Sequence, residues 1–291
     1  VWHYGDPLRE QRKLAAGEAA VDLAHLPVFT VSGPDRLTWL HALSSQAFEG
    51  LAPGVGVSAF ILDPQGHVEH TFTGVDDGET FWAFTEAGHL EALLTHLTRM
   101  VFASRVEVAD VSDAWALIGG AGGVRRVPRG DLEGELGDTR AGMWASEALR
   151  IAAGRPRVFL DADAKAIPNE LANPEGDLLG ESVHLKKGCY RGQETVARVH
   201  TLGRPPRRLT LLHLDGSAER LPEVGADVMS GEKVVGRMGT SAIHYELGPI
   251  GLALLKRNTP VDAPLSVEGI AASQEVVVDP DAGLHVRPVL R

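Results

Sequence analysis

The chain has 291 residues, about twice the usual size of one domain, so two or three compact units are expected. Apolar residues make up 44% and charged residues 23%, a composition that excludes a disordered or fibrous chain. The 28 lysines and arginines face 39 aspartates and glutamates, giving a formal net charge of -11. Because such a surface repels phosphate backbones, nucleic acid is not expected as a partner.

A single cysteine, Cys189, excludes an internal disulfide framework and any zinc site built from several thiolates. It fits a reducing compartment. No apolar run approaches the roughly 20 residues that span a bilayer, and the first six residues lack the charged and apolar blocks of a signal peptide. The sequence therefore predicts a soluble, cytoplasmic protein with no membrane partner.

The first part of the chain predicts an α+β layer and not a βαβ repeat. One helix is expected after Gly33, with Pro34 in its first turn, and a strongly amphipathic helix is expected from Leu90 to Val101. A turn is expected at 63–66 and a hairpin around 76–79. Strands are predicted at 28–32, 57–62, 67–75, 80–85, 105–110 and 114–118.

Glycine and charge crowd out apolar residues from Gly119 to Gly142, which predicts a long connection or a reduced subdomain. A helix is expected at 143–155, followed by a loop-rich stretch to residue 200. Short β-runs recur between Gly and Pro turns after Pro206, typical of a small antiparallel barrel. The predicted domains are an N-terminal α+β domain at 1–118, a shortened middle region at 119–204 and a C-terminal β-barrel at 205–291.

The most unusual string runs from Lys186 to Glu194 and contains the only cysteine. Cys189 stands beside Lys186, Lys187 and Arg191 in the sequence. Positive charge beside a thiol favours the thiolate, which attacks electrophiles and binds soft metals. Glycines let a ligand approach the backbone closely, while Gln193 and Glu194 offer groups that bind a polar heterocycle. The alternative is that Cys189 is a small buried hydrophobe, Tyr190 is a core residue and the glycines only make turns.

This string resembles the K-G-C-Y-x-G-Q-E signature of the YgfZ family, folate-binding relatives of the glycine-cleavage T-protein. The residues that carry the resemblance are Lys187, Gly188, Cys189, Tyr190, Gly192, Gln193, Glu194 and Arg198. Further landmarks follow in order over roughly residues 20 to 257. They are the strings at 31–37 and 63–66, Leu149-Arg150-Ile151 with Gly154 and Pro156, the string at 167–170, and Val235-Gly236 near Ser241.

The resemblance implies a T-protein-like multidomain fold around a central tetrahydrofolate pocket, with a C-terminal antiparallel β-barrel. It also implies a role in assembly or repair of iron-sulfur clusters in client enzymes, in which the family cysteine supplies the functional thiol. The expected partners are a reduced folate and iron-sulfur client enzymes or assembly proteins. Trp144, Glu170 and His70 are the folate-binding candidates, and no stably bound metal is predicted. Trp144 is included because flat heteroaromatic rings stack on aromatic faces, and the alternative is that it is a core residue.

One departure from T-proteins concerns an acidic pair on the strand after Gly66, one member of which assists the folate nitrogen. Here the aligned residues are His70 and Thr71. Glu69 is expected on the opposite face, because neighbouring residues of a strand alternate. The alternative function, a folate-dependent aminomethyltransferase or demethylase, is therefore less favoured.

Other patterns are less specific. His67 and His70 are expected on opposite faces of a strand, and His89 and His96 at solvent positions, so a metal site is not favoured. A cysteine hydrolase that pairs Cys189 with His184 or His200 lacks an identifiable third group and oxyanion hole. The glycines at 119–123 lack the lysine and hydroxyl of a P-loop. Arg204, Arg207 and Arg208 are interpreted as a solvated turn, with a polyanionic folate tail as the alternative.

Overall fold

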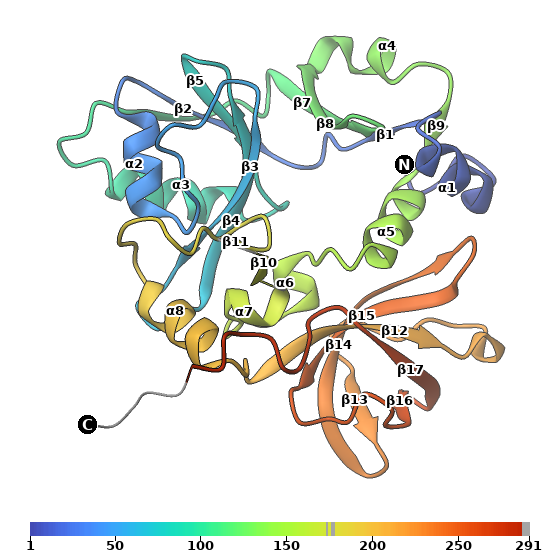
Figure 1. Cartoon of the computed structure of the whole chain (residues 1–291). Helices are drawn as coiled ribbons and strands as arrows, with labels where there is room; N and C mark the ends of the chain where they lie inside the picture. The colour runs from blue at the N-terminus through green and yellow to red at the C-terminus, as the bar shows by residue number, and fades with distance from the viewer. Residues whose placement is uncertain (173, 176–177, 287–291) are drawn as a thin grey trace, which may run out of the picture. The chain divides into compact units, whose positions relative to one another are not determined.

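The computed structural model describes residues 1–172, 174–175 and 178–286 (Figure 1). The chain folds into two compact units, each assembled from separate segments. Unit 1 comprises Val1–Ala16, Ala141–Glu175 and Glu194–Arg291, and unit 2 comprises Gly17–Arg140 and Gly176–Gln193. The sequence-based division used three contiguous segments instead. No helix among the described residues is long and apolar enough to cross a membrane.

Unit 2 is built on a five-stranded antiparallel sheet in the order β3-β4-β5-β2-β6. Its elements are β2 (Val28–Ser32), α2 (Arg36–Leu43), β3 (Gly56–Leu62), β4 (Val68–Asp76), β5 (Thr80–Phe84), α3 (Leu90–Arg99) and β6 (Glu107–Asp110). They confirm the predicted strands and both helices, although α2 begins two residues after Pro34. Local alternation was a sufficient signal here, because one face of the sheet is buried.

Helices α2 and α3 cover that buried face. Leu40 of α2 and Leu93 and Leu97 of α3 are fully buried and pack against Phe29 and Phe72 of the sheet. The aromatic rings of this core meet edge to face, the arrangement that aromatic quadrupoles favour. This core fixes the end of α2, against which the signature loop is seated.

A second, four-stranded sheet of unit 2 contains the glycine-rich segment. Its order is β8-β7-β1-β9, with β1 (Ala20–Asp22), β7 (Trp115–Gly120), β8 (Gly123–Pro128) and β9 (Arg140–Ala141). The prediction of a long connection from Gly119 onwards was therefore wrong, because 119–128 form most of a hairpin, and the alternative of a reduced subdomain agrees with this small sheet. A Cβ at Gly119 would lie 2.7 Å from Val21 Cγ1, so this glycine permits close packing inside the sheet.

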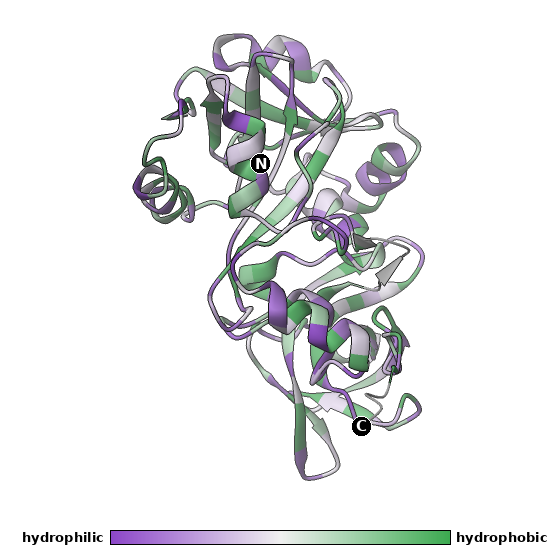
Figure 2. Cartoon of the chain, turned by 60° about the vertical axis from the view of Figure 1, so that its left-hand side comes forward, coloured by the Kyte–Doolittle hydropathy of each residue, from purple (hydrophilic) through white to green (hydrophobic). Residues whose placement is uncertain are grey.

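Unit 1 contains the predicted C-terminal barrel. Its six antiparallel strands close in the order β12-β15-β14-β13-β16-β17. They are β12 (Arg207–Leu214), β13 (Asp227–Ser230), β14 (Lys233–His244), β15 (Gly248–Lys256), β16 (Leu265–Val267) and β17 (Ile270–Val276). Leu212 and Leu214 fill the interior, whereas Leu209 and Leu211 pack outside against α5 (Met143–Ala152). Apolar stretches run along the strands, and polar residues gather at hairpin tips (Figure 2).

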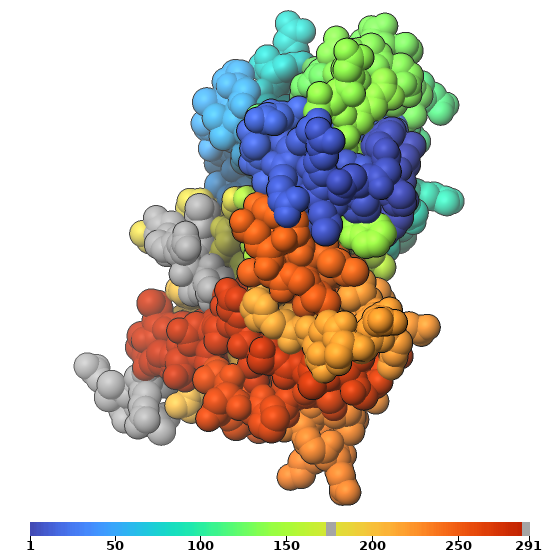
Figure 3. Space-filling view, turned by 90° about the vertical axis from the view of Figure 1, so that its right-hand side faces the viewer, coloured from blue at the N-terminus to red at the C-terminus, as the bar shows by residue number. Residues whose placement is uncertain are grey.

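The N-terminal helix α1 (Pro7–Ala15) also belongs to unit 1 and packs beside the β14–β15 hairpin. The buried Gln11 side chain donates to Ile243 O at 2.9 Å and accepts from Tyr245 N at 2.9 Å. Figure 3 shows the N-terminal residues (blue) against this hairpin (orange). The remaining elements are η1 (Arg129–Asp131), α4 (Leu132–Leu136), α6 (Val158–Asp161), α7 (Pro168–Leu171), β10 (Pro174–Glu175), β11 (Leu178–Leu179), α8 (Gln193–Leu202) and η2 (Gly216–Ala218).

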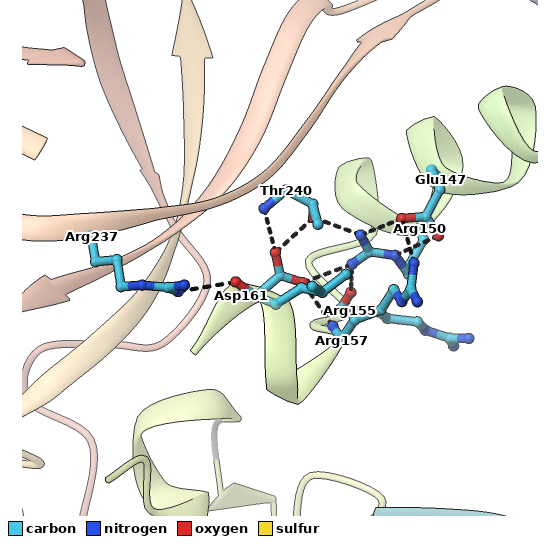
Figure 4. A network of polar contacts seen from close by, with 8 residues as sticks. Glu147, Arg150, Arg155, Arg157, Asp161, Arg237 and Thr240 are labelled. Atoms are coloured by element: carbon cyan, nitrogen blue, oxygen red, sulfur yellow. Dashed lines mark hydrogen bonds and ion pairs between the residues drawn. The ribbon is translucent and has the colours of Figure 1, made fainter. Parts of the chain in front are cut away.

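A buried ionic network joins α5 and α6 to the barrel (Figure 4). The fully buried Asp161 carboxylate accepts from Thr240 N and Oγ1, both at 2.6 Å, and from Arg157 N at 2.7 Å. Arg150 donates to it at 3.1 Å and pairs with Glu147 at 2.9 Å. A bulge in β14 between Met238 and Ser241 interrupts the pairing where Thr240 meets the carboxylate. The Leu149-Arg150-Ile151 landmark thus has a structural role.

The sequence had suggested that the arginines near the start of the barrel form a solvated turn, but Arg207 and Arg208 do not. Arg208 is fully buried and donates to Thr210 Oγ1 at 2.7 Å and Gln274 Oε1 at 2.6 Å. Arg207 binds the buried Glu170 through two bonds of 2.8 Å. Arg208 lies on the same face of the first barrel strand as Leu212 and Leu214, which fill the interior, whereas Arg207 lies on the outer face and binds Glu170, and Arg204 is exposed.

Candidate functional site

The signature loop, residues 186–194, presents its cysteine at the surface. Cys189 is exposed, so the alternative of a small buried hydrophobe was wrong for this residue. The next residue, Tyr190, is buried as that alternative predicted, and burial raises its pKa to about 12. The loop therefore exposes Cys189 between the buried side chains of Lys187 and Tyr190.

Lys187 anchors the start of the loop. Its side chain is buried, and its ammonium donates to the carbonyl oxygens of His41, Ser44 at 2.6 Å and Gln46 at 3.1 Å. These carbonyls lie at and just beyond the C-terminal end of α2, where the helix dipole favours a cation. Burial lowers the pKa of Lys187 to about 8.

Gly192 anchors the other end of the loop on the turn between β3 and β4. Its φ is +79°, and a Cβ there would lie 2.5 Å from Asp63 O and 3.0 Å from Gly66 Cα. Two strings singled out in the sequence, the Lys-Gly-Cys-Tyr loop and the Asp-Pro-Gln-Gly turn, are thus in direct contact. Arg191 adds an ion pair with Glu69 at 3.0 Å.

The last residues of the signature are helical. The sequence had predicted a loop at this position. Gln193 begins α8, and Glu194 and Arg198 are exposed on it, whereas Val196 is buried. The backbone N–H of Gln193 donates to Tyr190 O at 3.2 Å, which continues the chain from the loop into the helix. This helix was not predicted from the sequence, because glycines are frequent just before it. The helical segment itself begins only after Gly192.

We expect Gly192→Ala to destabilise unit 2 by about 2 kcal/mol or more, because alanine is strained at positive φ and its methyl would meet backbone that cannot move aside. Urea unfolding measures the loss. Gly188→Ala is the matched control: its φ is not positive and nothing lies within 4 Å of the added methyl, so a change within about 0.5 kcal/mol is expected. Equal stability of both variants would contradict this account of the loop.

A groove of about 740 Å³ borders the loop within unit 2 and is lined by Glu69, His70, Glu91, His96, Arg99 and Arg191, among others. The expectation that Glu69 points away from His70 was wrong. Pairing shifts from Ile61 with His70 to Leu62 with Val68, which leaves Glu69 as the extra residue of a β-bulge. A bulge breaks the alternation of side chains, so neighbouring residues line one groove.

His70 lies against His96 of α3 with ring centroids 5.3 Å apart, so His96 is not a solvent position. Burial, together with the nearby charges of His96 and Arg191, lowers the pKa of His70 to about 4. Burial also lowers the pKa of His96. His70 is therefore neutral at pH 7 and a weak base. The groove and the place of Glu69 and His96 in it were not predicted from the sequence. A β-bulge and the packing of a helix leave no periodic pattern in the sequence.

The lowered pKa of His70 predicts acid sensitivity. Because the folded protein binds this proton more weakly than the unfolded chain, stability is full above pH 6.5 and falls as the pH drops towards 4. With allowance for the partial exposure of His70, the free energy of unfolding should fall by about 1 to 2 kcal/mol over this pH range. Urea unfolding at pH 7 and pH 4.5 should show His70→Gln losing less stability than wild type over this interval. Equal losses would show that His70 titrates normally.

The other folate candidates lie in unit 1. Trp144 is half-buried at the start of α5, with the Trp2 ring centroid at 6.0 Å. Glu170 is fully buried, and both its oxygens bind Arg207, so its carboxylate is already satisfied. Within residues 1–172, 174–175 and 178–286, no three His, Cys, Asp or Glu side chains are grouped to hold a metal ion.

Comparisons with known proteins match both ends of the chain. The GCVT N-terminal domain model matches residues 6–124, and the CAF17 C-terminal beta-barrel domain model matches residues 207–280. An Arabidopsis thaliana protein named as a chloroplastic candidate transferase is 25% identical over 88% of this chain and 70% of its own length. The tRNA-modifying protein YgfZ of Escherichia coli is 41% identical over 133 residues, 44% of this chain but only 37% of that protein.

Among solved structures, the glycine cleavage system aminomethyltransferase T from Bartonella henselae matches with a TM-score of 0.77. The match covers 97% of this chain and 91% of that chain at 16% identity, a level that establishes the fold alone. The predicted α+β, T-protein-like fold with a C-terminal β-barrel is confirmed.

Proposed function

Because this chain is a YgfZ-like relative of the glycine-cleavage T-protein, we propose that it is a tetrahydrofolate-binding accessory protein for assembly or repair of iron-sulfur clusters in client enzymes. One observation carries the proposal: the only cysteine is exposed between the buried Lys187 and the closely packed Gly192, the two anchors of the signature loop. A thiolate is the protein ligand that iron-sulfur chemistry uses, and it must be accessible to act on another protein.

A reduced folate fits some of the candidate residues and not others. Trp144 offers a partly exposed indole to a flat ring, and His70 contributes a neutral imidazole that lines a groove. Glu170 does not fit, because Arg207 occupies its carboxylate. We therefore keep Trp144 and His70 as the folate candidates.

The second candidate, aminomethyl transfer, receives less support. That reaction needs a carboxylate where His70 stands, and an imidazole with a pKa of about 4 is a poor substitute as a base. Glu69 enters the same groove but is paired with Arg191. Tetrahydrofolate-dependent release of ammonia from an aminomethyl-loaded carrier protein, well above background, would establish this enzyme activity and displace the proposed one.

The name of the Escherichia coli relative refers to tRNA modification. A net charge of -11 disfavours direct binding of this chain to RNA. We therefore propose that any such link runs through an iron-sulfur client enzyme.

Two measurements test the proposed function. Calorimetric titration with tetrahydrofolate is expected to show binding. If millimolar ligand gives neither heat nor a thermal shift, the proposal that the chain binds folate is wrong. In a deletion strain, the cluster occupancy of client enzymes is expected to fall and to recover when the chain is supplied. Unchanged cluster occupancy in the deletion strain would contradict the accessory role, whether or not the chain binds folate.

A further inference from the structure

The ammonium of Lys187 has no proton left for the neighbouring thiol. An ammonium carries three N–H donors, and three carbonyl oxygens, those of His41, Ser44 and Gln46, accept them. The Tyr190 ring lies 5.0 Å from the same nitrogen. Lys187 is therefore saturated by its own unit, although it stands two residues from Cys189.

We propose that Lys187 is a positioning residue for Cys189, which ties the loop to the end of α2 and so holds the thiol at a fixed, exposed place. The inference deepens the proposed function and rests on it for the importance of the thiol. The sequence-based interpretation was that Lys186, Lys187 and Arg191 favour the thiolate. The proposal replaces it for Lys187, which binds carbonyl oxygens, and for Arg191, which is directed to Glu69.

The segment that accepts Lys187 is itself held in place. Ser45 N donates to Phe60 O of the sheet at 2.8 Å, and the His41 ring accepts from the backbone N–H groups of Phe48 and Glu49 at 3.3 and 3.2 Å. His184 N also donates to Ser45 O at 2.9 Å, just before the signature. The carbonyls thus form a preformed cradle and do not depend on Lys187 for their positions.

The second anchor limits how far the thiol can move. Lys187 and Gly192 are five residues apart, a contour of about 17 Å when fully extended. Gly188 lies between them with nothing within 4 Å of its Cβ position, so no packing on this residue holds the loop. On the other side of Cys189, the buried Tyr190 still holds the chain, so release of Lys187 should loosen the loop on the N-terminal side of the thiol. Three hydrogen bonds from one buried ammonium fix its position relative to the end of α2, which is the positioning role assigned here.

The single cysteine allows a direct test, because a nitroxide label attached to Cys189 reports the motion of the loop. Electron paramagnetic resonance of the wild type should show a motionally restricted label. Lys187→Met, which keeps the length and loses the donors, should shorten the rotational correlation time severalfold at unchanged circular dichroism. Lys186→Met, at the exposed neighbouring position, should give the wild-type spectrum.

Further arms keep the test decisive. Lys187→Gln retains two N–H donors and should give an intermediate spectrum, and it replaces Lys187→Met if that variant fails to fold. In Lys187→Ala, added propylammonium should restore the restricted spectrum by occupying the cradle. A freely tumbling label in the wild type, or a Lys187→Met spectrum identical to wild type, would overturn the proposal. These spectra do not depend on folate or client enzymes, so failure of the proposed function is detected separately.

Discussion

Cys189→Ser is expected to abolish the cellular role while leaving the fold intact. The thiol is exposed, so replacement of sulfur by oxygen should change the free energy of unfolding by no more than about 0.5 kcal/mol. The hydroxyl of serine ionises far less readily than a thiol and cannot replace it as a soft ligand or nucleophile. Client-enzyme activity in a deletion strain should therefore stay at the level of the empty vector.

Complementation and the melting temperature are measured on the same variant. Gly188→Ala serves as the matched control in this loop, since it preserves the thiol and meets no neighbouring atom. Full complementation by a stable Cys189→Ser protein would show that the cysteine does not carry the chemistry. A large drop in melting temperature would instead indicate a structural thiol, contrary to its exposure.

Asp161→Asn is expected to give the largest loss of stability in unit 1. Four donors converge on this fully buried carboxylate, and an asparagine amide would direct N–H groups at some of them. Arg150 would keep Glu147 as its only carboxylate partner in the network. Breaking a buried ionic network by one partner costs about 3 to 5 kcal/mol.

For a unit of this size, that loss corresponds to a decrease in melting temperature of roughly 6 °C or more. Calorimetry measures it, and the exposed Asp262→Asn in the same unit should stay within about 0.5 kcal/mol of wild type. A thermal midpoint for Asp161→Asn close to that of wild type would mean that water replaces the lost acceptor, and the network would then contribute little.

The sequence by itself determined most strands of the first sheet and the barrel. The runs at 28–32 and 57–62 and the repeated short strands after Pro206 became strands, because short apolar, β-rich runs bounded by turn residues are a local signal for strands. The string around Cys189 also identified the candidate site, since its residue types are informative wherever they fold. Both inferences needed no knowledge of distant contacts.

The tertiary structure decided where the charged side chains point. One extra residue in β4 turned Glu69 into the groove of His70, and a bulge of that kind has no signature in the alternation. The contacts of Lys187 also depend on the tertiary structure. Only the folded chain brings the carbonyls at the end of α2, about 140 residues away in the sequence, to its ammonium. A sequence lists which charges lie near a thiol along the chain, but burial and hydrogen-bond saturation decide which of them it meets.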